Sequence, residues 1–149
     1  MKKTIILSLI FTLLGTLTGL IINTNHNKQL RTFNEEKKYY FLQEGIYSNE
    51  KNMLENTKEL DSKLVINEKN KYYVYLGITK EEKIAQKIKN IYQNKGYTLY
   101  IKEINIDNEE FYNNVTQFDL LINNTNKENE ILTIEEVVLA NYEEIILNQ

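Results

Sequence analysis

The chain has 149 residues, with 18 Lys and Arg against 21 Asp and Glu, no Cys, no Pro, no Trp and a single His, His26. This length predicts one domain with room for an appendage. The lack of Cys excludes disulfide frameworks, thiol nucleophiles and Cys-ligated zinc, and a single His excludes His-pair metal sites, so we expect neither a metal nor a cofactor.

An uncharged apolar stretch opens the chain. Residues 4–22 carry no charge, and a helix of this length spans about 28 Å, close to the hydrocarbon thickness of a bilayer. The run is longer than a signal-peptide core, and no small-x-small cleavage site follows it. We therefore predict that residues 1–23 are an uncleaved anchor in the cell membrane. Lys2 and Lys3 favour a cytoplasmic N-terminus and a single-pass protein with an extracytoplasmic C-terminal domain.

Polar residues without sustained periodicity follow the anchor. Residues 24–37 are predicted to be a linker, in which His26 has no chemical role. Beyond residue 23 the chain has 16 cations against 21 anions, a net charge of −5. A protein that binds nucleic acid by neutralising phosphates should have the opposite sign, so we expect no nucleic-acid partner.

A repeat organises the next segment. Residues 40–47 (YFLQEGIY) overlay residues 72–79 (YYVYLGIT), with Tyr, Gly and Ile coinciding. Each segment is rich in aromatic and branched residues and has Gly near its end, which is typical of a strand that runs into a turn. Two further strands are predicted at 64–66 and 98–104, with the hairpin turn NEKN at 67–70.

A helix is predicted after each repeated strand. Thr79-x-x-Glu82 has the pattern of a capping box, and Ser48 or Asn49 can cap the first helix. Gly96 suits the C-terminus of the second helix, where a left-handed conformation is needed. Residues 38–106 are thus predicted to be an α+β domain of order βαββαβ, a four-stranded antiparallel sheet with two helices on one face.

The last third of the chain, residues 107–149, is predicted to be a helical pair. Asn108 or Asp107 can cap a helix that carries Phe111, and Thr133-x-x-Glu136 has the pattern of a second capping box.

Strand alternation predicts which side chains leave the core. Val74, Leu76 and Ile78 should meet the helices, so the other face should be aromatic and uncovered. That face would display Phe41, Gln43, Tyr73, Tyr75, Tyr100 and Lys102. Exposed tyrosines suit flat amphipathic ligands such as sugars. The alternative is that residues 107–149 cover this face and make its tyrosines core residues.

Glu44 breaks the alternation, because it falls on the inward side of its strand. An unpaired carboxylate there is costly, so a bulge, an edge position or a lysine partner must accommodate it. The other carboxylates offer no acid–base pair, because they adjoin each other in sequence at helix ends or on predicted exposed faces. The pairs are Glu35-Glu36, Glu81-Glu82, Glu109-Glu110, Glu135-Glu136 and Glu143-Glu144. We expect no catalytic site and no enzyme.

The segments FLQ-x-GIYS and YYVYLGIT, each opening half of a βαββαβ repeat behind an apolar anchor, resemble the SPOR (sporulation-related repeat) family. The resemblance covers residues 38–106. It implies a non-enzymatic, membrane-anchored cell-wall protein that binds peptidoglycan glycan strands at the division septum or during sporulation. Gln43 and Ser48 match polar positions of the family. The resulting glycan-binding set is Phe41, Gln43, Ser48, Tyr73, Tyr75, Tyr100 and Lys102.

A second hypothesis keeps the fold and changes the ligand. In it, a SPOR-like module binds other proteins, such as division or sporulation membrane proteins, through the sheet face or the C-terminal helices. The acidic charge, Tyr73 and the extra helices motivate it.

Overall fold

The structure is a computed structural model that describes residues 37–147. Within this range no helix has the length and apolarity needed to cross a bilayer. The predicted anchor and almost all of the predicted linker lie outside the described residues.

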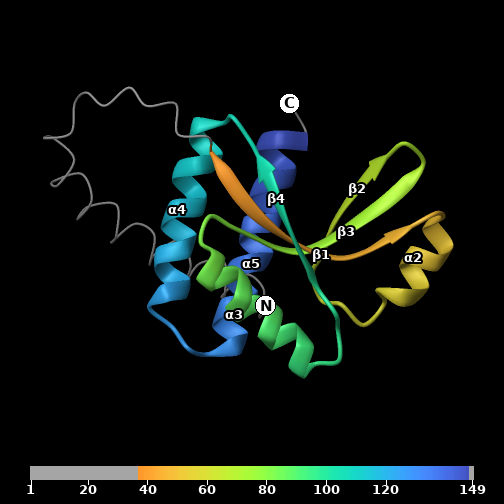
Figure 1. Ribbon diagram of the computed structural model, residues 1–149, viewed down its shortest axis with the longest axis horizontal. Helices are drawn as coiled ribbons and strands as arrows, with labels where there is room; N and C mark the ends of the chain where they lie inside the picture. The colour runs from red at the N-terminus through yellow and green to blue at the C-terminus, as the bar shows by residue number, and fades with distance from the viewer. Residues whose placement is uncertain (1–36, 148–149) are drawn as a thin grey trace, which may run out of the picture. The chain divides into compact units, whose positions relative to one another are not determined.

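The domain is an α+β fold built on a four-stranded antiparallel sheet, as predicted (Figure 1). The strands lie in the order β2-β3-β1-β4, so β2 and β4 are the edges. Their bounds are β1 Lys38–Tyr47, β2 Leu64–Glu68, β3 Lys71–Thr79 and β4 Tyr100–Asn105.

The β2–β3 hairpin turns where the sequence predicts it. Glu68 pairs with Lys71, which leaves Lys69 and Asn70 as a two-residue turn, and both have positive φ angles. This is the backbone of the tight turns whose twist matches that of the flanking strands.

Two opposed irregularities lie in the central β1–β3 pair. Between Phe41 and Gln43 the partner strand β3 carries one extra residue, and between Gln43 and Gly45 the extra residue is Glu44 of β1. Glu44 therefore sits in a bulge, one of the three accommodations open to it, and its carboxylate accepts a hydrogen bond from the Tyr47 hydroxyl at 2.8 Å. Each bulge reverses the alternation of the residues beyond it.

Helices α2 (Glu50–Asn56) and α3 (Glu82–Asn94) follow the two repeated strands. The Asn49 side chain caps α2, accepting from the Asn52 N–H at 2.9 Å. Gly96, with φ +90°, ends α3 in a Schellman motif in which the Tyr97 N–H donates to the Tyr92 carbonyl.

The capping box predicted at Thr79 does not form. Helix α3 begins at Glu82, after the N-cap residue Glu81, which makes no side-chain cap. The Thr79 hydroxyl instead donates to Asp119 at 2.6 Å, a contact from a distant helix that the local pattern does not reveal.

The C-terminal segment contains α4 (Glu109–Asn123), α5 (Glu128–Tyr142) and the π-helical turn η2 (Glu143–Leu147). Asn108 caps α4 by accepting from the Phe111 N–H, as predicted. The second predicted capping box is wrong, because α5 starts five residues earlier than Thr133. The Thr133 hydroxyl donates to the Asn129 carbonyl in the preceding turn.

Two apolar clusters pack on opposite faces of the sheet. The repeat-helix face carries Leu42, Val74 and Leu76, which pack with residues of α2 and α3. The C-terminal-helix face carries Phe41, Tyr75 and Ile78, which pack with residues of α4 and α5. Helices α4 and α5 therefore cover the part of the second face that carries these residues, as the alternative prediction has it (Figure 1).

Candidate functional site

The aromatic face predicted to be free is largely core. Phe41 is fully buried, and Gln43 and Tyr75 are 6% and 7% exposed. The Phe41 ring packs edge-on against Tyr75 and against Tyr142, both at 5.3 Å between ring centroids. The prediction that these three side chains face solvent is wrong, because α4 and α5 need an apolar surface and find it here.

One of the three β3 side chains predicted to meet the repeat helices lies on the other face. Val74 and Leu76 lie on the repeat-helix face as predicted, but Ile78 lies on the opposite face. Its partner across the sheet is Phe41. The β3 bulge at Leu76 and Gly77 reverses the alternation and so changes the face of Ile78.

The other four predicted ligand residues remain accessible. Tyr100 is 58% exposed, Lys102 and Ser48 are exposed, and Tyr73 is half-buried. Lys102 pairs with Phe41 and Tyr100 pairs with Gln43, so both belong to the C-terminal-helix face. Ser48 follows β1 at the other end of that strand, so the predicted set does not form one continuous surface.

The predicted set lacks two residues of the exposed surface, Ile46 and Ile66. Ile46 is 49% exposed and pairs with Tyr73, which pairs in turn with Ile66 on β2. This row continues the C-terminal-helix face, where Ile66 and Tyr73 border the cluster under α4 and α5. We term the surface formed by Ile46, Ile66, Tyr73 and Tyr100 the open end of the sheet.

The signal for Ile46 was present in the sequence. A bulge at Glu44 inserts one residue into β1, and it moves Ile46 to the face that bears Phe41 and Gln43. The misplaced charge of Glu44 marked this position. Strict alternation would place Gly45 on that face and Ile46 on the opposite one, which is wrong for both residues.

Two buried carboxylates fasten the C-terminal helices to β3. Asp119 of α4 accepts from the Thr79 hydroxyl and from the Lys80 N–H at 2.9 Å. Glu135 of α5 accepts from the Ile78 N–H at 2.9 Å. Strand β2 pairs with β3 only as far as Tyr75, so these carboxylates serve backbone donors beyond the reach of β2.

Burial is the main cause of the raised pKa values of Asp119 and Glu135. Burial raises the pKa of the Asp119 carboxyl to about 6, against the lowering effect of its hydrogen bonds from Thr79 and Lys80. Burial raises the pKa of the Glu135 carboxyl well above its ordinary value. Glu135 is 1% exposed, and its Oε1 has no hydrogen-bond partner among the described residues. The prediction that the Glu135-Glu136 pair is solvated is thus wrong for Glu135.

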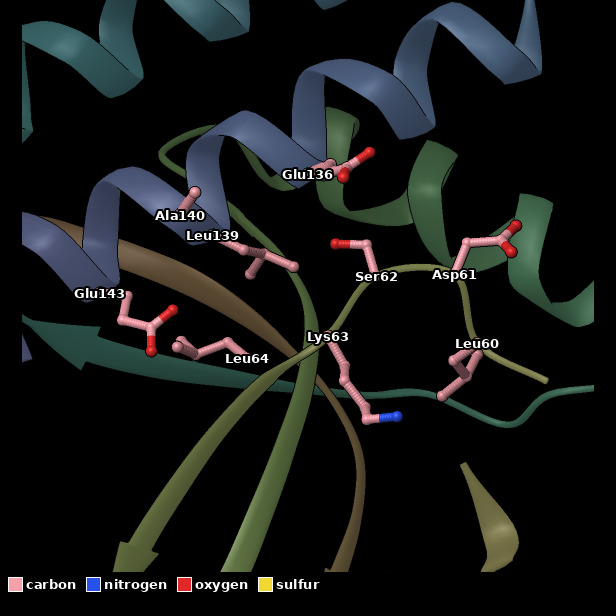
Figure 2. Close-up of a pocket in the computed structure, with 9 residues that line it drawn as sticks. All are labelled: Leu60, Asp61, Ser62, Lys63, Leu64, Glu136, Leu139, Ala140 and Glu143. Atoms are coloured by element: carbon pink, nitrogen blue, oxygen red, sulfur yellow. The ribbon is translucent and has the colours of Figure 1, made fainter. Parts of the chain in front are cut away.

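A shallow groove of about 330 Å³ lies between α5 and the loop that leads into β2 (Figure 2). Its apolar lining comes from Leu60, Leu64 and Leu139. Glu136 and Glu143 line it from α5, and Asp61 lines it from the loop.

No protein-family model, curated protein or solved structure matches the chain. Within residues 37–147, no group of three or more acidic, His or Cys side chains is arranged to hold a metal ion. The open end of the sheet and the groove beside α5 are two surface features of the described domain.

Proposed function

We propose that this protein is a non-enzymatic protein–protein interaction module, resembling a SPOR domain in its βαββαβ order, whose binding surface is the open end of the sheet. The observation that carries the proposal is the division of the C-terminal-helix face. Helices α4 and α5 bury Phe41, Gln43 and Tyr75, while Ile46 and Tyr100 stay about half exposed.

The chemistry of the open end favours a protein ligand. Two of its four members are aliphatic, and aliphatic side chains provide apolar area without the flat ring on which a sugar stacks. Tyrosine is enriched at the centre of protein interfaces, where the surrounding surface is more apolar than the rim. We further propose that residues 4–22 anchor the module in the cell membrane, where its partners would be division or sporulation membrane proteins.

Glycan binding is the second candidate function, and the accessible Tyr73, Tyr100 and Lys102 favour it. The two tyrosines offer rings, and Lys102 makes no ion pair with another described residue, so its ammonium is available to hydroxyl groups. Peptidoglycan glycan strands would then contact a smaller platform than the seven-residue set.

Site-specific photocrosslinking in the cells that produce the protein tests both candidates. A benzophenone side chain replaces Ile46 or Tyr100 in the full-length chain, and Leu120, an exposed residue of α4, is the control position. We expect a discrete protein adduct from positions 46 and 100 and none from position 120.

The adducts also distinguish the ligands. Adducts that protease removes and muramidase leaves intact support the protein ligand. Adducts that collapse on muramidase digestion support the glycan instead. If neither position 46 nor position 100 gives an adduct, the open end of the sheet is not a binding surface and both proposals fail.

A further inference from the structure

The groove beside α5 is continuous with an unpaired strand edge. Strand β2 is an edge of the sheet, and Leu64, its first residue, also lines the groove. In Figure 2, Glu143 lies near Leu64 at the start of β2, and Glu136 lies farther along α5 on the side of Ser62. An extended chain running along β2 would therefore continue into the groove.

The edge lacks lysine, proline and bulges, three features that prevent strand addition, and its one charged residue, Glu68, lies at its end. Strand β2 has the sequence LVINE, with no proline and no lysine, and its pairing with β3 runs without a register shift. Proteins commonly protect exposed edges with lysine, proline or bulges. Unprotected edges serve as templates for a partner strand, whose main chain supplies the hydrogen bonds.

The acidic wall of the groove selects the charge of the occupant. Asp61, Glu136 and Glu143 are exposed, and none of them forms an ion pair or a hydrogen bond with another described residue. The nearest cation, Lys63, is directed elsewhere, since its Nζ donates to the Thr57 carbonyl at 3.0 Å. Three carboxylates without partners around an apolar floor complement a cationic side chain.

Residue pairing across the sheet determines which side chains of an added strand would face α5. Leu64, Ile66 and Glu68 share the C-terminal-helix face, because Leu64 pairs with Tyr75 and Ile66 pairs with Tyr73. A residue added beside Leu64 projects toward α5 and its carboxylates. The residue added beside Ile66 extends the open end of the sheet, and one added beside Glu68 faces a further carboxylate.

We propose that the outer edge of β2 and the adjoining groove bind an extended protein segment by strand addition. On the face toward α5, this segment carries an apolar residue opposite Ile66 and a Lys or Arg opposite Leu64. The inference rests on the proposed function, since it names the kind of protein segment that the module recognises.

A short peptide probes the edge directly. The seven-residue peptide Thr-Lys-Thr-Val-Thr-Lys-Thr, amidated at its C-terminus and fluorescently labelled at its N-terminus, presents the required face in either chain direction. Its fully N-methylated form keeps every side chain and loses the donors of a strand ladder. Fluorescence anisotropy with the full-length protein in non-ionic micelles measures both affinities.

We expect the unmodified peptide to bind saturably and at least about tenfold more tightly than the methylated form, because main-chain bonds supply the affinity of strand addition. Amide NMR shifts should be largest over Leu64–Glu68. Equal affinity of the two peptides, or no saturation up to millimolar concentration, overturns the inference.

Matched charge reversals test the groove. The double variant E136K/E143K changes the α5 wall, and E128K/E144K makes the same change in net charge at exposed positions that do not line the groove. We expect about fivefold weaker peptide binding in the first and less than about twofold change in the second at low salt. If peptide binding weakens equally in both variants, the effect comes from the net charge of the protein and not from the groove, which contradicts the inference.

The photocrosslinking experiment separates this inference from the proposed function. A protein adduct at Tyr100 that persists unchanged in E136K/E143K, with no selective peptide binding, leaves the interaction module standing and removes the β2 edge as its site. Selective peptide binding together with loss of the adduct in E136K/E143K supports both.

Discussion

The two faces of the sheet are closed by different means. On the repeat-helix face, α3 contributes apolar side chains such as Ile84 and Ile88 and no buried polar or charged side chain. Helices α4 and α5 contribute aromatic packing to the opposite face, and their buried acids Asp119 and Glu135 accept hydrogen bonds at the end of β3 that β2 does not reach. These carboxylates thus take the place of a neighbouring strand, because they accept from the Ile78 and Lys80 N–H groups beyond the last pair of β2 and β3.

The largest expected effect tests whether the aromatic cluster under α4 is a true core. Phe111 is fully buried, and its ring packs against Tyr39 at 5.2 Å and Tyr142 at 5.4 Å. We expect Phe111→Ala to lower the free energy of unfolding in urea by about 3–5 kcal/mol, through lost burial and the cavity left behind. Leu120→Ala, on the exposed side of α4, should change it by less than about 0.5 kcal/mol. Similar small losses in both variants would mean that α4 is not part of the core.

An intermediate effect isolates the buried charge of Glu135 on α5. The pKa of Glu135 is raised on folding, so the folded state holds its proton to higher pH than the unfolded state. Stability then falls as the pH rises from the ordinary value of 4.5 through the folded pKa. Glutamine can still accept from Ile78, and it has no charge to bury.

We therefore expect Glu135→Gln to stabilise the protein at pH 8 by on the order of 1–3 kcal/mol, the range for an unsatisfied buried group. At pH 4 the two proteins should have nearly equal stability, because Glu135 is protonated in the folded wild type. Urea midpoints at both values measure this, with Glu136→Gln as the exposed control. Asp119 is present in both proteins and contributes its own fall between its ordinary value of 3.8 and about 6. A destabilised E135Q at pH 8 would contradict the prediction.

The smallest effect concerns the repeat-helix face. Gly96 has φ +90°, and a Cβ there would meet no atom within 4 Å, so the cost of Gly96→Ala is conformational only. We expect a loss of about 1 kcal/mol in the urea unfolding free energy, against less than about 0.5 kcal/mol for the neighbouring exposed Lys95→Ala. Equal stability of both variants would show that the Schellman motif contributes nothing to the end of α3.

The sequence predicts several local features correctly, although both capping boxes are wrong, and it does not predict which sheet surfaces are buried. The caps at Asn49 and Asn108, the turn at 69–70 and the left-handed Gly96 follow from residues close to one another. The burial of Phe41 depends on a segment some 70 residues away, and strand alternation holds no information about that segment. The uncovered aromatic face was therefore one of two hypotheses. The apolar content of residues 107–149 favoured the other, in which these residues cover that face.

The buried carboxylates were hidden for a related reason. Glu135 is followed by Glu136 and so has the sequence context of a solvated acid, whereas Asp119 lies in the apolar run Phe118–Ile122, which gives no sign of its partner. Their partners, the Ile78 N–H and the Thr79 hydroxyl, are identified only by the tertiary fold. Which residues belong to the open end of the sheet depends in the same way on two bulges. Only the bulge at Glu44 is marked in the sequence, by a charged residue on the inward side of the strand.

The two glycines that coincide in the repeat have acquired different constraints. A Cβ at Gly45 would press on the ring of Tyr47, two residues away, whereas a Cβ at Gly77 would come within 3.0 Å of the Glu135 carboxylate and 3.1 Å of Leu42. A side chain at position 77 therefore requires Glu135 of α5 and Leu42 of β1 to shift by a few tenths of an ångström. Position 77 is thus constrained by a contact with α5, whereas position 45 is constrained by a residue of its own strand.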